Sequence, residues 1–430
     1  MKQVVWSTLS ESARVAALQR PAAQSDTGIS ESVRSIVSDV RARGDAALKD
    51  YTKKFDGVDL KTLSVPYQEI ENAEQAIGGP AASAIRRAYQ TIYKFHQPQG
   101  FQPYDRETLS GVSCARAVRP IERIGLYVPG GSAPLISTTL MIGVPSQIAG
   151  CPERILCTPC DQKGDINPHI LYAAKLCCIQ RVYKLGGAQA IAAMAYGTET
   201  IPTADKIFGP GNAYVTATKQ SVAEDPSGAA LDMPAGPSEV CVIADESTNP
   251  ILAAADLLSQ AEHDTMSQVL LIAPSESKAQ EIRDEVVKQI ETLPRKDIAG
   301  QAMQNSLVVV VDGMSQALEV SNFYAPEHLI LCFEGADKYV EAVHNAGSIF
   351  VGPWTTESAG DYCSGTNHVL PTYGYARCYS GLSVEAFQKT ITVQALTEHG
   401  LKNLGDTIET LARLEGLEAH ARAVSLRTNL

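Results

Sequence analysis

The segment LLSQAEHD, from Leu257 to Asp264, carries two side chains that can bind one metal ion together. Gln260 and His263 lie three positions apart, and a helix turns such residues to one face. That spacing can aim an amide oxygen and an imidazole nitrogen at one point. The alternative is that both side chains are solvated, with His263 favoured near the negative end of the helix dipole. The segment alone favours this alternative.

A second candidate is the adjacent pair Glu327 and His328 in the segment YAPEHL, which precedes an apolar run. Pro326 interrupts the preceding helix, so the pair lies at the mouth of a strand. A carboxylate beside an imidazole can move protons at neutral pH. In an ordinary loop such a pair is simply solvated.

The segment GPWTTESAGDYCSGTNHVLPT is long, irregular and rich in polar residues, as binding loops on a rigid scaffold are. Asp361 and His368 are its best ligands. Gln260, His263, Asp361 and His420 together offer two nitrogens and two oxygens, a set that suits zinc or another borderline divalent ion. Their spacing in the sequence does not show that they meet, and an amide oxygen is an uncommon zinc ligand.

Two glycine-rich turns, PGGSAP and GPGNAY, follow apolar runs and precede helical segments. Their backbone amides can approach a phosphate. Tyr214 stands where the third glycine of a dinucleotide fingerprint belongs, so the nucleotide signal is faint. Tight turns between a strand and a helix explain both segments equally well.

The elements that must position these residues alternate between strand and helix. The first hundred residues have helical periodicity, and two series of short β-rich runs follow from Ile121 onward. The runs are RIGLYVPG, RILCTP, RVYKLGG and KIFGPG, then VCVIAD, QVLLIAP, SLVVVVDG, HLILCFE and GSIFVG. This alternation predicts two parallel sheets covered on both faces, with sites beyond the carboxyl ends of the strands. Residues 225–238 and 352–381 are predicted loops, and the last segment is helical.

Composition limits the possible partners. The chain has 430 residues, 44% of them hydrophobic, and a net charge of −12, which suits a globular protein of two or three domains and argues against nucleic acid as a partner. No apolar run reaches membrane-spanning length. The ten cysteines are scattered, which fits reduced thiols in the cytoplasm. Cys157 and Cys160 form a single C-T-P-C, which we interpret as structural.

Seven motifs together resemble one family, the histidinol dehydrogenases. They are GLYVPGGSAPLISTTLM, GPGNAYVTATKQ, DMPAGPSEV, QAEHD, NFYAPEHL, GSIFVGPWTTESAGDYCSGTNHVLPT and EGLEAHARAVSLR, in family order from Gly125 to Arg427. Several long motifs in order are a much stronger signal than one glycine loop.

The resemblance implies an NAD-dependent, zinc-dependent homodimer in the cytoplasm. Its reaction would be the four-electron oxidation of L-histidinol, through L-histidinal, to L-histidine, the last step of histidine biosynthesis. The implied cofactors are one zinc ion per subunit and NAD. Neither a nucleic acid nor a membrane is an implied partner.

The resemblance also implies roles for individual residues. Glu327 and His328 match the catalytic acid/base pair. The implied zinc ligands, which also contact the substrate, are Gln260, His263, Asp361 and His420. Ser238, His328 and Glu415 match other residues that hold the substrate, and Tyr127, Gln189 and Asn212 match those around NAD.

The fold expected from the resemblance has two Rossmann-like parallel-sheet domains, a helical N-terminal arm and a small C-terminal helical tail. The expected boundaries are 1–23 for the arm, 24–126 with 237–382 for a larger domain carrying most site residues, 127–236 for the NAD domain, and 383–430 for the tail. The tail is expected to reach the active site of the other subunit.

Three other functions remain open. A relative on the same scaffold could oxidise another small alcohol, such as a sulfonated diol, but the Glu415 carboxylate favours a cationic amino alcohol. A metallohydrolase is a second possibility, although H-E-x-x-H is absent. A non-catalytic metal-binding protein is the third, and the Glu327–His328 pair argues against it.

Overall fold

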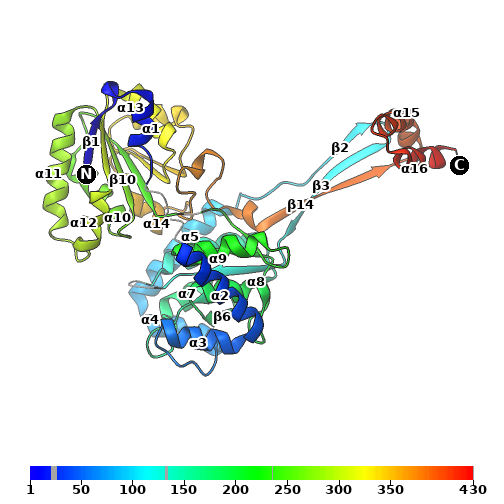
Figure 1. Cartoon of the computed structure of the whole chain (residues 1–430), viewed down its shortest axis with the longest axis horizontal. Helices are drawn as coiled ribbons and strands as arrows, with labels where there is room; N and C mark the ends of the chain where they lie inside the picture. Colours follow the sequence, from blue (N-terminus) through cyan, green and yellow to red (C-terminus); the bar gives the residue numbers. More distant parts are fainter. Residues whose placement is uncertain (21–26, 131–133, 235, 430) are drawn as a thin grey trace.

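Two α/β units and a projecting arm make up the protein (Figure 1). The computed structural model describes residues 1–20, 27–130, 134–234 and 236–429. All nine strands predicted from apolar runs are present, and the two parallel sheets are confirmed. No helix within the described ranges is long and apolar enough to cross a bilayer.

Sheet A has six parallel strands in the order β1-β11-β10-β9-β12-β13. Alternate side chains along β9 are buried on opposite faces, as in a parallel sheet covered on both sides: Val240 and Val242 pack toward α10–α12, and Cys241 and Ile243 toward α13. The strands are β1 (Lys2–Val5), β9 (Glu239–Ile243), β10 (Gln268–Ala273), β11 (Leu307–Val310), β12 (His328–Leu331) and β13 (Ser348–Val351). The helices are α1 (Glu11–Ala17), α10 (Pro250–Ala261), α11 (Glu276–Ile290), α12 (Lys296–Gln304), α13 (Met314–Tyr324) and α14 (Glu357–Tyr362).

Sheet B has five parallel strands in the order β6-β5-β4-β7-β8. Helices α4–α7 cover one face and α2, α3, α8 and α9 cover the other. The strands are β4 (Arg123–Tyr127), β5 (Glu153–Thr158), β6 (Arg181–Lys184), β7 (Lys206–Phe208) and β8 (Ala230–Leu231). The helices are α2 (Thr27–Arg43), α3 (Asp45–Phe55), α4 (Tyr67–Ile77), α5 (Gly79–His96), α6 (Ile136–Ala149), α7 (Pro168–Leu176), α8 (Gly187–Tyr196) and α9 (Ala213–Glu224).

The packing corrects part of the expected domain division. We expected residues 24–126 to join 237–382, but α2–α5 cover sheet B, where Val33 and Ile70 are buried on opposite faces. The expected boundary at 126/127 also falls inside β4. Residues 1–23, expected as a helical arm, begin with β1 at the edge of sheet A. Local helical periodicity shows which face a helix buries but not which sheet will cover it.

The projecting arm, which is distinct from the predicted N-terminal arm, is a three-stranded antiparallel ribbon, sheet C. The sequence did not predict it. Its strands are β2 (Tyr104–Leu109), β3 (Val112–Pro120) and β14 (Gln388–Leu396), in the order β14-β3-β2. The ribbon carries α15 (Glu398–Leu414) and α16 (Glu418–Thr428) far from both α/β units (Figure 1). Every residue of β2 is exposed, so this strand lacks the buried alternation from which strands are predicted.

Candidate active site

The Glu327–His328 pair lies at the amino edge of sheet A, because His328 is the first residue of β12. Helix α13 ends at Tyr324, and Ala325 adopts a left-handed conformation (φ +54°) that turns the chain into the strand. The expectation of a site beyond the carboxyl ends is therefore wrong for this pair. Helix α10 brings Gln260 to the same edge as this pair. The helix follows β9 and runs back across the sheet, so its last turn, with Gln260, lies at the amino edge.

The main chain of Glu239 fixes both members of the pair. Its N–H donates a hydrogen bond to Glu327 Oε2 (2.8 Å), and its carbonyl oxygen lies 3.0 Å from His328 Nδ1. A carbonyl oxygen can only accept, so Nδ1 carries a proton and donates it. In neutral His328 the lone pair is therefore on Nε2, which is buried and has no hydrogen-bond partner among the described residues. His328 is oriented as a base that acts through Nε2.

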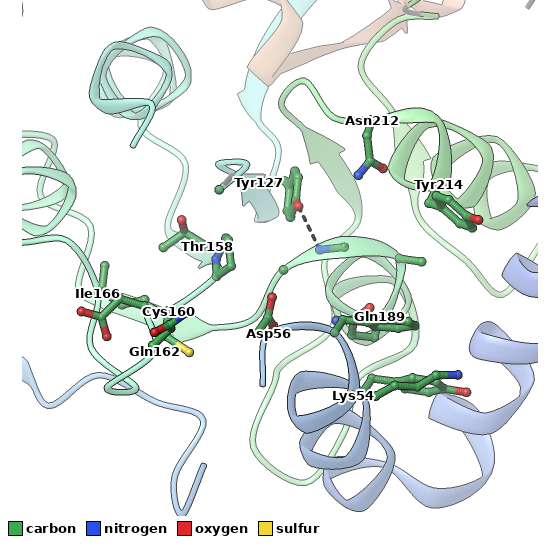
Figure 2. Close-up of a pocket in the computed structure, with 18 of the residues that line it drawn as sticks. Lys54, Asp56, Tyr127, Thr158, Cys160, Gln162, Ile166, Gln189, Asn212 and Tyr214 are labelled. Atoms are coloured by element: carbon green, nitrogen blue, oxygen red, sulfur yellow. Dashed lines mark hydrogen bonds between the residues drawn. The ribbon is translucent and has the colours of Figure 1, made fainter. Parts of the chain in front are cut away.

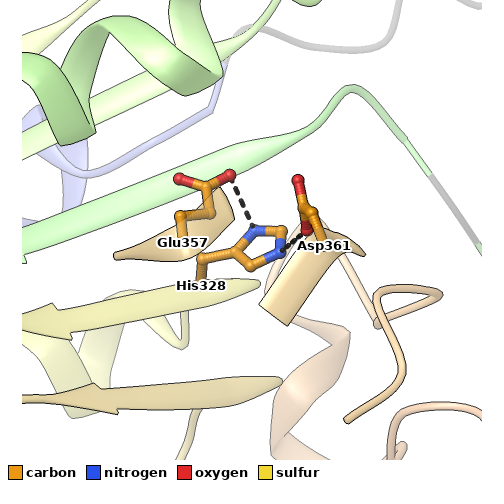
Figure 3. Close-up of side chains that lie close together, drawn as sticks. All are labelled: His328, Glu357 and Asp361. Atoms are coloured by element: carbon orange, nitrogen blue, oxygen red, sulfur yellow. Dashed lines mark ion pairs between the residues drawn. The ribbon is translucent and has the colours of Figure 1, made fainter. Parts of the chain in front are cut away.

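Three carboxylates surround the imidazole of His328, and two of them, Glu357 and Asp361, are drawn in Figure 3. Glu327 Oε2 and Glu357 Oε1 lie 3.6 and 3.8 Å from Nδ1, and Asp361 Oδ1 lies 3.7 Å from Nε2. Burial lowers the pKa of His328, but Glu357, Glu327 and Asp361 outweigh burial and raise it well above the ordinary value. The site therefore attracts positive charge.

Burial raises the pKa of both glutamates. It brings the pKa of Glu327 to about 7 and that of Glu357 to about 8, although His328 opposes both shifts. A carboxyl group with a pKa near neutrality can both accept and release a proton under working conditions. Glu327 is therefore suited to proton transfer, as the sequence suggested.

The site contains unpartnered ligand atoms that fit a metal ion. Gln260 is fully buried, yet neither its Oε1 nor its Nε2 has a hydrogen-bond partner among the described residues. Such a buried amide is costly unless something satisfies it. His328, Glu357 and Asp361 also offer one ligand atom each within 4.8 Å of one another. Nitrogen and oxygen donors of this kind suit zinc.

His263 and His368 both lie in the electrostatic field of Asp361. Partial burial lowers the pKa of His263 below its ordinary value, although the residue is open to solvent in the single chain, and Asp361 opposes the shift. Burial lowers the pKa of His368 to about 4 against the same opposition. Both imidazoles are neutral near pH 7, which is the form that binds metals.

The structure brings some predicted residues together and separates others. Ser238 directly precedes β9 at the amino edge, where its carbonyl oxygen accepts from the N–H of Gln268 (2.9 Å). Glu415 directly follows α15 as its C-cap, His420 lies on α16, and both are exposed at the end of the arm. Within one chain, α15 and α16 lie far from the unit that contains α10 and α14 (Figure 1).

Sequence reasoning missed Glu357 and Glu239, both almost completely buried. Thr356 caps α14 by accepting from the N–H of Ser358 (3.2 Å), so Glu357 has the pattern of an ordinary acidic residue in a first helical turn. No local signal marks its burial.

A separate cavity of about 1230 Å³ lies at the carboxyl ends of β4–β7 in sheet B. Tyr127, Gln189 and Asn212 all line it (Figure 2). The N–H of Gly187 donates to the Tyr127 hydroxyl (2.9 Å), and Asn212 caps α9 by accepting from the N–H of Val215 (3.1 Å). Strand β5 lies on one side of β4 and β7 on its other side, so the strand order reverses at β4. Parallel sheets bind nucleotides at such a point.

The GPGNAY turn needs its first glycine. Gly209 has φ +121°, and a Cβ there would lie 2.1 Å from the carbonyl oxygen of Tyr127. The carboxylate of Asp232 accepts a hydrogen bond from the N–H of Gly209 (2.9 Å), and Lys219 donates one to the carbonyl oxygen of Gly209 (2.9 Å). The turn is therefore held close to β4. Residues 131–133 of the PGGSAP turn lie outside the described residues.

The fold and the two sites define an α/β protein of oxidoreductase type, with a Rossmann-like cavity in one unit and an acid–imidazole centre in the other. The chain belongs to the histidinol dehydrogenase family, whose model matches residues 18–428. A histidinol dehydrogenase of Vibrio parahaemolyticus is 51% identical over 427 residues, which cover 99% of this chain and 98% of the relative. One of Xanthomonas euvesicatoria is 50% identical over 99% of both chains.

A crystal structure of histidinol dehydrogenase from Elizabethkingia anophelis has a similar fold. It is 48% identical to this chain and superposes with a TM-score of 0.95, over 100% of this chain and 98% of the other. The whole architecture, including the arm, is thus that of the family.

Proposed function

We propose that this protein oxidises L-histidinol to L-histidine through L-histidinal, with NAD⁺ as the acceptor of two hydrides in succession. The observation that carries the proposal is the buried Glu327–His328 pair, in which Nε2 of His328 is free and points toward Asp361. The names of relatives that cover nearly the whole chain support the substrate.

His328 is the base of both oxidation steps. Its Nε2 accepts the alcohol proton in the first step, while NAD⁺ bound in the sheet B cavity would supply the hydride acceptor. Glu327 then takes a proton from the water that adds to the aldehyde, while His328 returns its proton to the aldehyde oxygen. Neutral His328 then accepts a proton from the resulting hydrate as the second hydride leaves for a second NAD⁺. Each proton thus moves to a named atom at the amino edge of sheet A.

Gln260, His263 and Asp361 would hold a zinc ion with His420 of the partner subunit. Zinc, when bound, would orient the amine and imidazole of the substrate. The unpartnered amide of Gln260 and the neutral His263 support this ligand set. His328 and Glu357 then remain free for proton transfer and for balancing charge.

A cation at this site also explains how His328 can act as a base. The nearby carboxylates raise its pKa and so favour the charged imidazolium, which cannot accept a proton. Positive charge beside Asp361 counteracts the carboxylates and lowers the pKa of His328. A bound cation would therefore favour the neutral form of His328, which can accept a proton at Nε2.

The arm supports a homodimer with shared active sites. Leu411, Leu414 and Leu426 are exposed on α15 and α16, and Ile391 and Val393 on β14. Exposed apolar surface of this kind is typical of a protein interface. In the dimer each arm would bring Glu415 and His420 to the other subunit, where Glu415 and Ser238 would help to hold the cationic substrate.

The cysteines support a reducing compartment such as the cytoplasm. All ten are free thiols, and Cys157, Cys177 and Cys241 are completely buried. Burial raises the pKa of Cys151 to about 11, which makes a catalytic thiolate there unfavourable.

The deciding experiment is the amount of NADH formed per histidinol consumed, measured by absorbance with limiting substrate. We expect a ratio of two, and loss of turnover after chelation that zinc restores. A ratio of one would contradict the four-electron reaction. Turnover of a sulfonated diol instead of histidinol would indicate the other dehydrogenase function, and product formation without NAD⁺ would indicate a hydrolase.

A further inference from the structure

One carboxylate in the sheet B cavity has an oxygen without a partner in the protein. Asp56 is the C-cap of α3, and its backbone N–H donates to the carbonyl oxygen of Thr52 (2.9 Å). Its side chain projects into the cavity between Tyr127 and Gln189 (Figure 2). Oδ2 is buried and accepts no hydrogen bond from any described residue.

Folding alone does not account for this carboxylate. A negative charge at the C-terminal end of a helix faces the negative end of the dipole. Burial also raises the pKa of Asp56, because it disfavours the charged form. Other acids on α2 and α3 have their negative charge balanced by a cation: Asp39 and Asp50 both form ion pairs with Arg43 at 2.7 Å. Among the described residues no cation pairs with Asp56, which leaves Oδ2 available to the hydrogen-bond donors of a ligand.

The topology of sheet B indicates which part of a dinucleotide lies there. The strand order β6-β5-β4-β7-β8 corresponds to a dinucleotide-binding unit in which β4 is the first strand and β5 the second. In such units an acid near the end of the second strand binds the adenosine ribose. Strand β5 ends at Thr158, and the charge of Asp56 reaches the adjacent Cys160, where it contributes to a raised pKa that is caused mainly by burial.

The nearest acid on the strand β5 side is already used by its own loop. Oδ1 of Asp161 accepts from the N–H groups of Lys163 (2.8 Å) and Asp165 (3.0 Å). Asp56, which lines the same cavity as Thr158 and Cys160, is therefore the better candidate for the ribose acid.

The cavity as a whole disfavours an additional phosphate. Its described lining contains four carboxylates, two lysines and no arginine: Glu31, Asp56, Asp161, Asp165, Lys54 and Lys163. Arginine is the residue that accommodates the 2′-phosphate of NADP in comparable folds. The lining would repel that group.

We propose that Asp56 accepts hydrogen bonds from the adenosine ribose hydroxyls of NAD⁺ and excludes the 2′-phosphate of NADP⁺. This inference rests on the proposed function and deepens it, because it assigns the choice of dinucleotide to one side chain.

Calorimetric titration with NAD⁺, NADP⁺ and NAD⁺ lacking the adenosine 2′-hydroxyl tests this. We expect wild type to bind NAD⁺ at least about tenfold more tightly than the other two, since a hydrogen bond to a charged group is worth about 1.5–3 kcal/mol. Asp56→Asn should bring all three affinities within a few-fold of one another. Asp59→Asn, which neutralises a carboxylate three residues further along that does not line the cavity, should keep the wild-type ratios.

Equal weakening of all three dinucleotides in Asp56→Asn would overturn the role of Asp56 while leaving the use of NAD⁺ intact. Wild type that binds no dinucleotide would overturn the proposed cofactor as well. Circular dichroism checks that the variant folds. If Asp56→Asn does not fold, Asp56→Ser is measured in its place. Independently of any variant, equal affinity of wild type for NAD⁺ and for NAD⁺ lacking the adenosine 2′-hydroxyl would contradict the inference.

Discussion

The buried carboxylate of Glu239 is paired with the guanidinium of Arg20, which comes from the N-terminal segment of the chain. Nη2 of Arg20 lies 2.8 Å from Oε2 of Glu239, and the guanidinium stacks on Tyr324, 3.9 Å from the ring centroid. The main chain of the same glutamate holds Glu327 and His328. A residue at the start of the chain thus supports the catalytic pair through one intermediary.

Replacing Arg20 should therefore destabilise the protein more than an ordinary surface change does. Arg20→Ala leaves a buried charge on Glu239, and we expect the free energy of unfolding to fall by about 3–5 kcal/mol in urea titrations. Arg20→Met combined with Glu239→Gln removes both charges and should recover part of this loss. Equal destabilisation of the two variants would mean that the ion pair itself contributes little.

Replacing the acid/base pair should separate chemistry from metal binding. Glu327→Gln and His328→Asn each remove a proton acceptor, so we expect turnover to fall by about 10²–10⁴-fold. Zinc content, measured by atomic emission on dialysed protein, should stay at one ion per subunit. Loss of zinc in either variant would show that the residue is a metal ligand instead.

Mixing two inactive variants should restore activity if the tail completes the site of the other subunit. His263→Asn damages the body of the site and His420→Asn damages the tail, so a mixed dimer contains one intact site of two. After random exchange of subunits at equal amounts, about one quarter of wild-type activity should return, since half of the dimers are mixed. A mixture that stays inactive although subunits exchange would mean that each site draws on a single chain.

Asp256 should make stability depend on pH. Burial raises its folded-state pKa to about 6, above the unfolded value of 3.8, although Thr356 opposes the shift. The folded state therefore holds the proton more tightly, and stability is lost as pH rises from about 4 to 6. Asp256→Asn cannot ionise, so relative to wild type it should gain on the order of 2–3 kcal/mol between pH 4 and pH 7.

Urea midpoints at the two pH values measure this gain. Asp312→Asn, a change at an exposed position on the same unit, serves as the control and should show no comparable gain. Parallel behaviour of Asp256→Asn and wild type would mean that Asp256 is not desolvated in solution.

Much of the fold follows from local patterns. Nine strands of sheets A and B lie in short apolar runs that can be recognised without a structure. The edge strands β1 and β8 are less buried and were not predicted. The ribbon was not predicted because β2 and most of β14 are exposed. The packing of α2–α5 on sheet B was not predicted either, since periodicity identifies the buried face of a helix but not its partner.

The candidate site was predictable to different degrees. Glu327 and His328 stand together in the sequence, and the family motifs identified Gln260, His263 and Asp361. Glu239 and Glu357 were missed because only the tertiary fold buries them. The prediction that the site lies at the carboxyl edge of the sheet was also wrong. The edge at which the site lies depends on where β12 begins, at His328, and on where α10 ends. Those boundaries are set by packing.

The helical end of the arm has very little interior of its own. Of the seventeen residues of α15 only Gly400, Gly405 and Ala412 are buried, and α16 adds Ala421 and Val424. A cluster of such small side chains cannot shield the neighbouring leucines from water. In the proposed homodimer this surface would be buried only when two subunits meet, so protein concentration would become a variable of folding, and at high dilution the surface would stay available for aggregation.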